Sequence, residues 1–237
     1  MRVYLKTPLL ISIHLPKTAG SSFVQSLSDH FADRLYVDYG DAPLNSCRWW
    51  RNASAVLQSL RYRGRHLINV DCIHGHFLPI KYRLIRSTRA VRFVTWMRDP
   101  VERVASHYHF WRQSYEPHSA LALHRRVVEE DWSFERFFAS PEMRNVYAQF
   151  LWGCSMSSLQ FIGITEHYEE DFRHFSRVFL KATMPPHHLR MNSAKTGVRY
   201  VNDPRLRAEI ERIHKGDVMM YRRALELRQA RIGRQRD

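Results

Sequence analysis

Three short segments of the chain carry side chains suited to chemistry on an anion. The first, His14–Ser22, combines a lysine with small and hydroxyl residues; the second, His74–His76, reads His-Gly-His. The third, Arg98–Pro100, reads Arg-Asp-Pro, and Ser106 stands eight residues after the arginine. Two of these segments resemble halves of an anion-binding site and the middle one offers a base. Together they indicate an enzyme that acts on a phosphorylated or sulfated nucleotide.

The first segment has the residues of a phosphate-binding loop without being a Walker A sequence. The expected ligands of the anion are Lys17, Thr18, Ala19, Gly20, Ser21 and Ser22. Because the lysine precedes the glycine and no glycine lies five residues before Gly20, kinase or GTPase chemistry is disfavoured. Small residues let backbone N–H groups approach an anion, and Lys17 can stabilise charge on a leaving group. The alternative is an ordinary polar turn with a surface lysine.

The histidine segment supplies the candidate general base. A neutral imidazole near pH 7 can take a proton from an alcohol, and His76 is the residue we expect to do so, with His74 as the second catalytic candidate. Either could instead be a structural turn histidine. Two histidines at i and i+2 without a third ligand are weak evidence for a metal, so we expect none. His107 and His109 are rival bases, although His107 should point away from the helix face of Ser106.

The third segment completes the proposed anion site. An arginine fork and a serine hydroxyl two turns into a helix can converge on one phosphate, so Arg98 and Ser106 are expected to bind the nucleotide. Arg-Asp-Pro is alternatively just a well-capped helix start. A polar stretch near the C-terminus could be a surface loop or a flap over the nucleotide, and its candidate ligands are Asn192, Ser193 and Lys195.

Alternating apolar runs and helical patterns must position these residues. Buried strands are predicted at Leu9–His14, His66–Ile73, Val91–Met97 and Gln160–Thr165. Helices are predicted around Phe23, Leu27 and Phe31, and at Pro100–Arg112, Tyr168–Lys181 and Pro204–Arg234, with a helical insert over residues 115–152. Strands that alternate with helices favour one α/β domain over residues 1–237, with a parallel sheet flanked by helices. Ligands of such sheets bind beyond the carboxyl ends of the strands, where all three segments fall.

Two helix starts are predicted from their capping residues. Asp99 is a suitable N-cap, Pro100 suits the first helical position, and Glu102 stands where a capping box requires an acid. Ser21 or Ser22 is expected to cap the helix after the first segment, which would leave backbone N–H groups facing the loop.

The charge of the chain favours acidic partners. Its 37 Lys and Arg residues exceed its 23 Asp and Glu residues, which gives a formal net charge of +14. Heparin-like polysaccharide, anionic lipid and nucleic acid all fit this charge. Three cysteines without CxxC spacing argue against a disulfide framework, and no apolar run approaches the roughly 20 residues that span a bilayer. We therefore expect a soluble, cytoplasmic protein without an anchor.

Taken together, the motifs resemble those of the PAPS-dependent carbohydrate sulfotransferases, most closely the heparan sulfate and uronyl 2-O-sulfotransferases. The resemblance implies that Pro16–Ser22 holds the 5′-phosphosulfate, that Arg98 and Ser106 bind the 3′-phosphate, and that the second histidine of His-Gly-His is the catalytic base. Weaker similarities are Gly163–Glu166, which resembles a Gly-x-Thr-Glu strand end, and Asp217–Tyr221, which resembles a terminal Asp-x-x-x-Tyr. The implied fold is a P-loop-like three-layer α/β fold.

The expected activity is transfer of a sulfuryl group from PAPS to a hydroxyl of a carbohydrate, with an acidic polysaccharide as a candidate acceptor. His76 would remove the acceptor proton and Lys17 would stabilise the leaving phosphate oxygen, without a metal and without a nucleic-acid partner. The rival hypothesis is a non-catalytic protein that binds heparin-like chains or nucleic acid through its positive charge.

Overall fold

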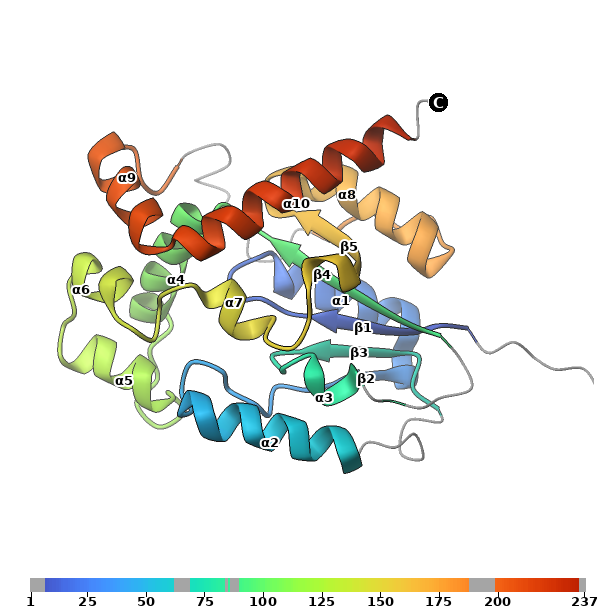
Figure 1. The fold of residues 1–237 in the computed structure, drawn as a ribbon, viewed down its shortest axis with the longest axis horizontal. Helices are drawn as coiled ribbons and strands as arrows, with labels where there is room; N and C mark the ends of the chain where they lie inside the picture. Colours follow the sequence, from blue (N-terminus) through green and yellow to red (C-terminus); the bar gives the residue numbers. More distant parts are fainter. Residues whose placement is uncertain (1–6, 62–68, 84, 86–89, 188–198, 235–237) are drawn as a thin grey trace, which may run out of the picture.

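A five-stranded parallel sheet forms the centre of the molecule (Figure 1). The computed structural model describes residues 7–61, 69–83, 85, 90–187 and 199–234. The strands, in the spatial order β2-β3-β1-β4-β5, are β1 Leu9–Ile13, β2 Leu35–Val37, β3 Cys72–Gly75, β4 Val91–Met97 and β5 Leu159–Ile164. The predicted α/β class with a central parallel sheet is confirmed.

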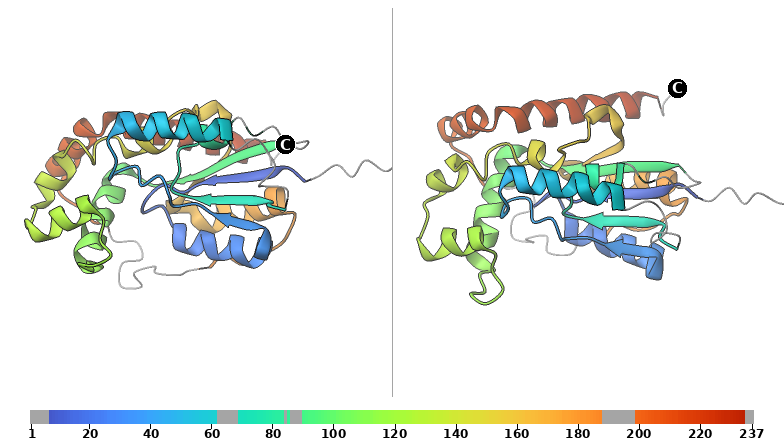
Figure 2. Two further views of the ribbon diagram at one scale, coloured as in Figure 1. Left: turned by 90° about the horizontal axis from the view of Figure 1, so that it is seen from below. Right: turned by 60° about the horizontal axis from the view of Figure 1, so that its bottom comes forward.

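Helices cover both faces of the sheet, which gives three layers (Figure 2). Successive residues of a strand point to opposite faces, so each strand feeds two hydrophobic cores. Leu10 of β1 packs in one core with Phe23 and Phe172 from α1 (Gly20–Phe31) and α8 (Tyr168–Phe175). Its neighbour Ile11 packs in the other core, to which the central and C-terminal helices contribute. The central strands are therefore mostly apolar, as expected for a parallel sheet covered on both sides.

The remaining helices arise between and after the strands. They are α2 Arg48–Arg61, α3 Ile80–Arg83, α4 Pro100–Gln113, α5 Ala122–Glu129, α6 Phe134–Ala139, α7 Val146–Phe150, α9 Pro204–Ile213 and α10 Lys215–Gly233. Short helical turns occupy Ala32–Arg34, Met156–Ser158, Thr165–His167 and Ser176–Leu180. The predicted helical insert corresponds to α5, α6 and α7. None of the helices in the described part of the chain has the length and apolar character needed to cross a membrane.

Several predicted boundaries differ from the structure. Of the strand predicted at His66–Ile73, residues 66–68 lie outside the described residues, and β3 spans Cys72–Gly75 because the pairing of Gly75 with Ile13 extends it toward the site. The C-terminal helical segment is divided at His214 into α9 and α10. Strand β2 and helix α2 were not predicted. Strand β2 is only three residues long and largely exposed, so it has no buried apolar run. Helix α2 buries Arg51, Ala55 and Ser59 and has its apolar residues on the outer side.

Only part of the capping prediction is correct. The Asp99 carboxylate accepts hydrogen bonds from the backbone N–H groups of Val101 and Glu102, so Asp99 caps α4 as predicted. The capping box is not formed, because the Glu102 carboxylate accepts from Tyr200 N at 2.8 Å. No serine caps α1: its N-cap is Ala19, in the left-handed conformation and without a side-chain cap. At α4 a tertiary contact replaces the missing half of the capping box, because Asp99 N donates to Glu166 Oε1 instead.

Candidate functional site

The strand register brings the predicted segments to one edge of the sheet. Ile13 at the end of β1 is paired with Gly75 of β3 on one side and with Thr95 of β4 on the other. The first residue after β1, His14, donates its backbone N–H to Gly75 O at 2.9 Å. The loops that carry Lys17, His76 and Arg98 therefore all leave the carboxyl ends of three adjacent strands. This convergence agrees with the sequence-based expectation.

Three imidazole rings stack at this edge. The His14 ring lies 4.3 Å from the His76 ring and 5.1 Å from the His74 ring between centroids, with interplanar angles of 18° and 24°. His14 is the first residue of the first predicted segment, but no role of its own was predicted for it. The available signal was its position at the end of β1. Because Ile13 pairs with Gly75, the residues that follow them, His14 and His76, lie side by side.

The environment of His76 fixes its tautomer. Its Nδ1 lies 2.7 Å from the carbonyl oxygen of His14. Since a carbonyl can only accept, Nδ1 carries the proton and Nε2 keeps its lone pair. Burial lowers the pKa of His76 below its usual value, and the bond to His14 O opposes part of this shift. The imidazole is therefore neutral at pH 7 and available as a base through Nε2.

His74 is more deeply buried than His76. His74 is 1% exposed, and its Nδ1 lies 2.8 Å from the Ser12 hydroxyl oxygen. Burial, aided by the neighbouring His76, lowers the pKa of His74 to about 3. The His74 ring is therefore neutral at pH 7.

Gly75 must be a glycine for the two histidines to occupy these places. Its φ is +154°, and a Cβ at this position would lie 1.7 Å from the carbonyl oxygen of Asp38. Asp38 follows β2, donates its backbone N–H to His74 O, and accepts from Lys81 Nζ at 2.6 Å. The next residue, Tyr39, places its ring edge-on against His76 at 4.9 Å. Strand β2 thus positions one wall of the site.

The loop after β1 has the backbone of an anion-binding turn. Lys17 and Ala19 both have left-handed φ values, 66° and 63°, which L-residues adopt at a cost of about 1–3 kcal/mol each. Alternation of left- and right-handed residues turns successive N–H groups to one side. The first-turn N–H groups of α1 lack intrahelical acceptors by geometry, and Ala19 offers no side-chain cap. The strained loop is thus suited to hold an anion at the helix N-terminus.

Small residues in this loop also permit the histidine stack. A Cβ on Gly20 would lie 1.7 Å from His14 Nε2, so the imidazole rests directly against the first residue of α1. The Thr18 hydroxyl donates to Leu15 O at 2.8 Å and braces the turn. Thr18 was expected to donate to the ligand; in this structure its side chain serves the loop, and its backbone is the group left for binding.

The Lys17 side chain lies against α4. Its Nζ is 3.7 Å from the centroid of the Phe110 ring. Burial is the main cause that lowers the pKa of His14 and of His107. Nearby charge adds to both shifts: His76, His74 and then Lys17 at His14, and Arg103 followed by Lys17 and His76 at His107. Lys17, His14, His76 and His107 therefore share one electrostatic environment.

Arg98 and Ser106 flank this region on the α4 side. The Arg98 backbone is held by the Tyr147 hydroxyl, and its guanidinium carbon lies 5.6 Å from the Tyr200 ring centroid. Ser106 is buried one helical turn before Phe110, the residue that contacts Lys17. Ser106 therefore lies on α4 between the helix start that follows Arg98 and Phe110, which contacts Lys17.

The rival histidines on α4 have different surroundings. His107 is buried against Trp111 and Phe137, and its Nδ1 has no hydrogen-bond partner among the described residues. His109 stacks on Tyr200, with 5.4 Å between ring centroids. Neither ring belongs to the stack at the strand ends. The predicted ligands Asn192, Ser193 and Lys195 lie outside the described residues.

The C-terminal helix supports the Arg98–Asp99 turn through two intermediaries. Asp217 accepts from Tyr147 N at 2.9 Å, at the N-terminus of α7, and Tyr147 in turn contacts Arg98. One turn later along α10, the Tyr221 hydroxyl donates to Glu166 Oε2 at 3.1 Å, and Glu166 Oε1 accepts from Asp99 N at 2.9 Å. The two segments with weaker sequence similarity, Gly163–Glu166 and Asp217–Tyr221, therefore both support the Arg98–Asp99 turn.

The fold and the edge site define a three-layer α/β protein in which a strained loop at an uncapped helix N-terminus lies beside a neutral imidazole. Among the described residues, no three His, Cys, Asp or Glu side chains are grouped so that they could hold a metal ion. No protein-family model matches the chain, and no curated protein matches it significantly.

Proposed function

We propose that the protein is a PAPS-dependent sulfotransferase that transfers a sulfuryl group to a hydroxyl of a carbohydrate acceptor. One observation carries the proposal: an imidazole with its lone pair fixed on Nε2 lies at the same sheet edge as a helix N-terminus that has no side-chain cap. The base and the anion site are the two parts that sulfuryl transfer from a nucleotide to an alcohol requires.

In the proposed reaction, His76 Nε2 takes the proton of the acceptor hydroxyl. The acceptor oxygen forms a bond to sulfur while the bond between sulfur and the 5′-phosphate oxygen breaks. The products are the sulfate ester and 3′,5′-ADP, with the proton on His76. The loop from Lys17 to Ser22 would hold the 5′-phosphosulfate through backbone N–H groups, and Arg98 with Ser106 would bind the 3′-phosphate.

Lys17 must leave Phe110 to stabilise the leaving oxygen. A cation–π contact is worth about 0.5–1 kcal/mol at an exposed site and about 2 kcal/mol when it is desolvated. A hydrogen bond between an ammonium and a charged phosphate is worth about 1.5–3 kcal/mol. Because the two energies are similar in size, an anion bound in the loop would compete with the Phe110 ring for Lys17.

Nucleotide binding tests the cofactor part of the proposal. A thermal shift assay should give a larger stabilisation with 3′,5′-ADP than with 5′-AMP, because only the former carries a 3′-phosphate. Equal or absent shifts would contradict the proposal. Heparin binding that weakens steeply with salt, without nucleotide discrimination, would favour a non-catalytic polyanion-binding protein.

Turnover tests the chemical part. PAPS consumption should be screened against uronic-acid polymers, simple glycans and phenols. His76→Ala and Lys17→Ala should each reduce turnover by at least about 10²-fold. His118→Ala and Lys215→Ala, at exposed positions on other elements, are the matched controls. Acceptance of phenols alone would contradict the carbohydrate acceptor while leaving sulfuryl transfer in place.

A further inference from the structure

Helix α2 turns its apolar side chains outward. Trp49, Trp50, Leu57 and Leu60 are 69%, 68%, 61% and 50% exposed, and Val56 is 41% exposed. At 100° per residue these five positions fall on one face of the helix. The helix lies at the lower margin of the molecule in Figure 1. We call this surface, formed by these five side chains, the α2 outer face.

The opposite side of the helix attaches it to the protein through polar and small residues. Arg51, Ala55 and Ser59 are buried. The Arg51 guanidinium donates to the carbonyl oxygen of Pro43 and lies 3.5 Å from Gln149 Oε1. A helix normally buries its apolar side and exposes its polar side, and α2 does the reverse. A contiguous exposed apolar surface of this kind marks an interaction site.

The charge around the helix identifies the type of partner. Arg48 and Arg61 are exposed at its two ends. Helix α2 itself contains three arginines, Arg48, Arg51 and Arg61, and no acidic residue. The partner must offer both an apolar layer and negative charge.

We propose that the α2 outer face docks on an anionic lipid bilayer. Tryptophan favours the boundary between headgroups and acyl chains, where its apolar ring and polar N–H are both accommodated. With the helix lying in the plane of the membrane, Leu57 and Leu60 would reach the acyl boundary. Arg48 and Arg61 would contact lipid phosphates at the two ends. This docking is independent of sulfuryl transfer.

A second copy of the chain fits this surface less well. Symmetric pairing of two α2 outer faces would bring four arginines together, from Arg48 and Arg61 of each copy, while α2 contains no acid to neutralise them. Like charges in such a contact are destabilising. A bilayer of anionic lipids supplies the missing negative charge.

Sedimentation with vesicles tests the proposal on the full chain. Wild type should bind vesicles of phosphatidylcholine with phosphatidylserine and bind phosphatidylcholine vesicles much more weakly. The double variant Trp49→Gln/Trp50→Gln should lose affinity on the order of a hundredfold, because two large side chains no longer leave water. Arg48→Gln/Arg61→Gln should lose roughly thirtyfold, from two basic residues near the surface.

Matched variants test whether losing exposed apolar area or positive charge anywhere on the molecule weakens vesicle binding. Leu121→Gln/Met219→Gln and Arg177→Gln/Arg222→Gln change exposed residues on other elements and should leave vesicle binding unchanged. Circular dichroism checks that each variant is folded. Equal losses in both sets, or no binding to either vesicle, would overturn the proposal. So would a dimer in light scattering that the Trp49/Trp50 variant abolishes, since this would assign the α2 outer face to a second copy.

Discussion

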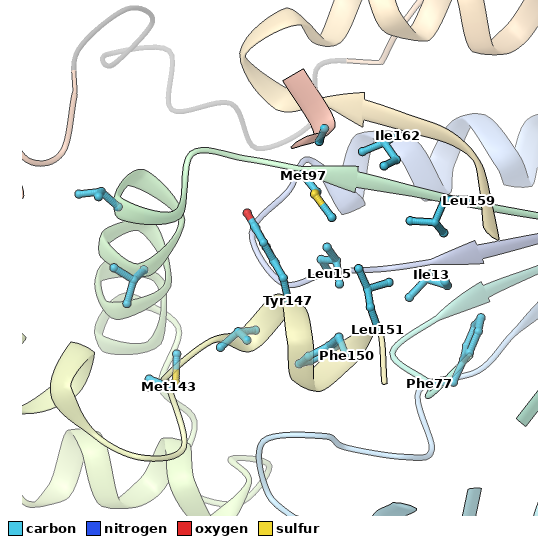
Figure 3. Close-up of a cluster of buried hydrophobic side chains, with 14 of the residues drawn as sticks. Ile13, Leu15, Phe77, Met97, Met143, Tyr147, Phe150, Leu151, Leu159 and Ile162 are labelled. Atoms are coloured by element: carbon cyan, nitrogen blue, oxygen red, sulfur yellow. The ribbon is translucent and has the colours of Figure 1, made fainter. Parts of the chain in front are cut away.

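The Tyr147 hydroxyl bridges both backbone groups of Arg98. It accepts from Arg98 N at 3.0 Å and donates to Arg98 O at 2.5 Å. Figure 3 shows Tyr147 extending from α7 with its hydroxyl toward the end of β4, beside Leu15. Because Tyr147 N is itself bound by Asp217, the proposed phosphate-binding arginine is positioned by a helix from the far end of the chain. The position of Arg98 thus depends on packing between α7 and α10.

Tyr147→Phe should weaken nucleotide binding through this bridge. Loss of the hydroxyl leaves two backbone groups of Arg98 without a partner, at a cost of about 1–3 kcal/mol in the free energy of unfolding. Movement of Arg98 should reduce 3′,5′-ADP affinity by about fivefold or more, measured by calorimetry. Tyr108→Phe, which removes a bond to Trp132 O, is the control and should leave affinity unchanged. Unchanged affinity in Tyr147→Phe would contradict the positioning role.

Gly75→Ala should destabilise the protein severely. The new Cβ would meet the Asp38 carbonyl oxygen at 1.7 Å, and the φ of +154° is unfavourable for an L-residue. We expect a loss of at least about 3 kcal/mol in urea denaturation, or failure to fold. At Gly233 no atom lies within 4 Å of an added Cβ, so Gly233→Ala should be neutral or stabilise by up to about 1 kcal/mol. Similar stabilities for both variants would refute this explanation.

The pH dependence of turnover should report a base with a low pKa. Since burial lowers the pKa of His76 below 6.5, the neutral form is already dominant at pH 7. As the pH rises, kcat/KM should increase through a pKa below 6.5 and then reach a plateau. NMR titration of labelled histidine, with His76→Gln used to assign the signal, should give the same pKa. A rate that still climbs strongly above pH 7 would exclude His76 as the base.

Stability should fall in mild acid because of the buried histidines. The pKa values of His14, His74 and His107 are all lowered, chiefly by burial, so below pH 6.5 the unfolded chain takes up protons that the folded chain does not. Their contribution is fully present above pH 6.5 and is lost as the pH falls, by up to about 1.4 kcal/mol per pH unit for each.

One substitution isolates this effect. His107→Gln removes a titrating ring whose Nδ1 has no partner in the described structure, so the slope of unfolding free energy between pH 6.5 and 5 should flatten. Burial raises the pKa of Asp217 to about 6, so protonation of this carboxyl stabilises the folded state as the pH falls. This contribution is the same in wild type and variant and does not alter the difference between their slopes. Urea denaturation at several pH values measures both slopes. Identical slopes would mean that His107 titrates normally in the folded state.

Phe110→Leu should release Lys17 from its contact with the ring. The cation–π interaction is worth about 0.5–1 kcal/mol, so 3′,5′-ADP affinity should rise by about twofold to fivefold when it is lost. Phe110→Tyr retains an aromatic face and should bind as wild type does. A decrease in affinity with leucine would mean that the ring positions Lys17 for the anion instead of competing with it.

Much of the architecture follows from local patterns in the sequence. The strand at Val91–Met97 matches its prediction residue for residue, since six apolar or β-branched residues among its seven, followed by a helix cap, leave little freedom. Asp99 caps α4 as its side chain and the following proline require. The parallel order then places Lys17, His76 and Arg98 at one edge, because strand ends in such a sheet share a side.

The sequence by itself determined the class of fold, the cap at Asp99 and the edge at which the candidate residues gather. Only the tertiary structure decided which groups touch: the stack of His14 on His76, the Tyr147 bridge to Arg98, and the outward apolar side of α2. Periodicity and capping are local and can be read along the chain. Register between strands, and the side on which a helix packs, depend on residues that are distant in sequence, so no local pattern specifies them.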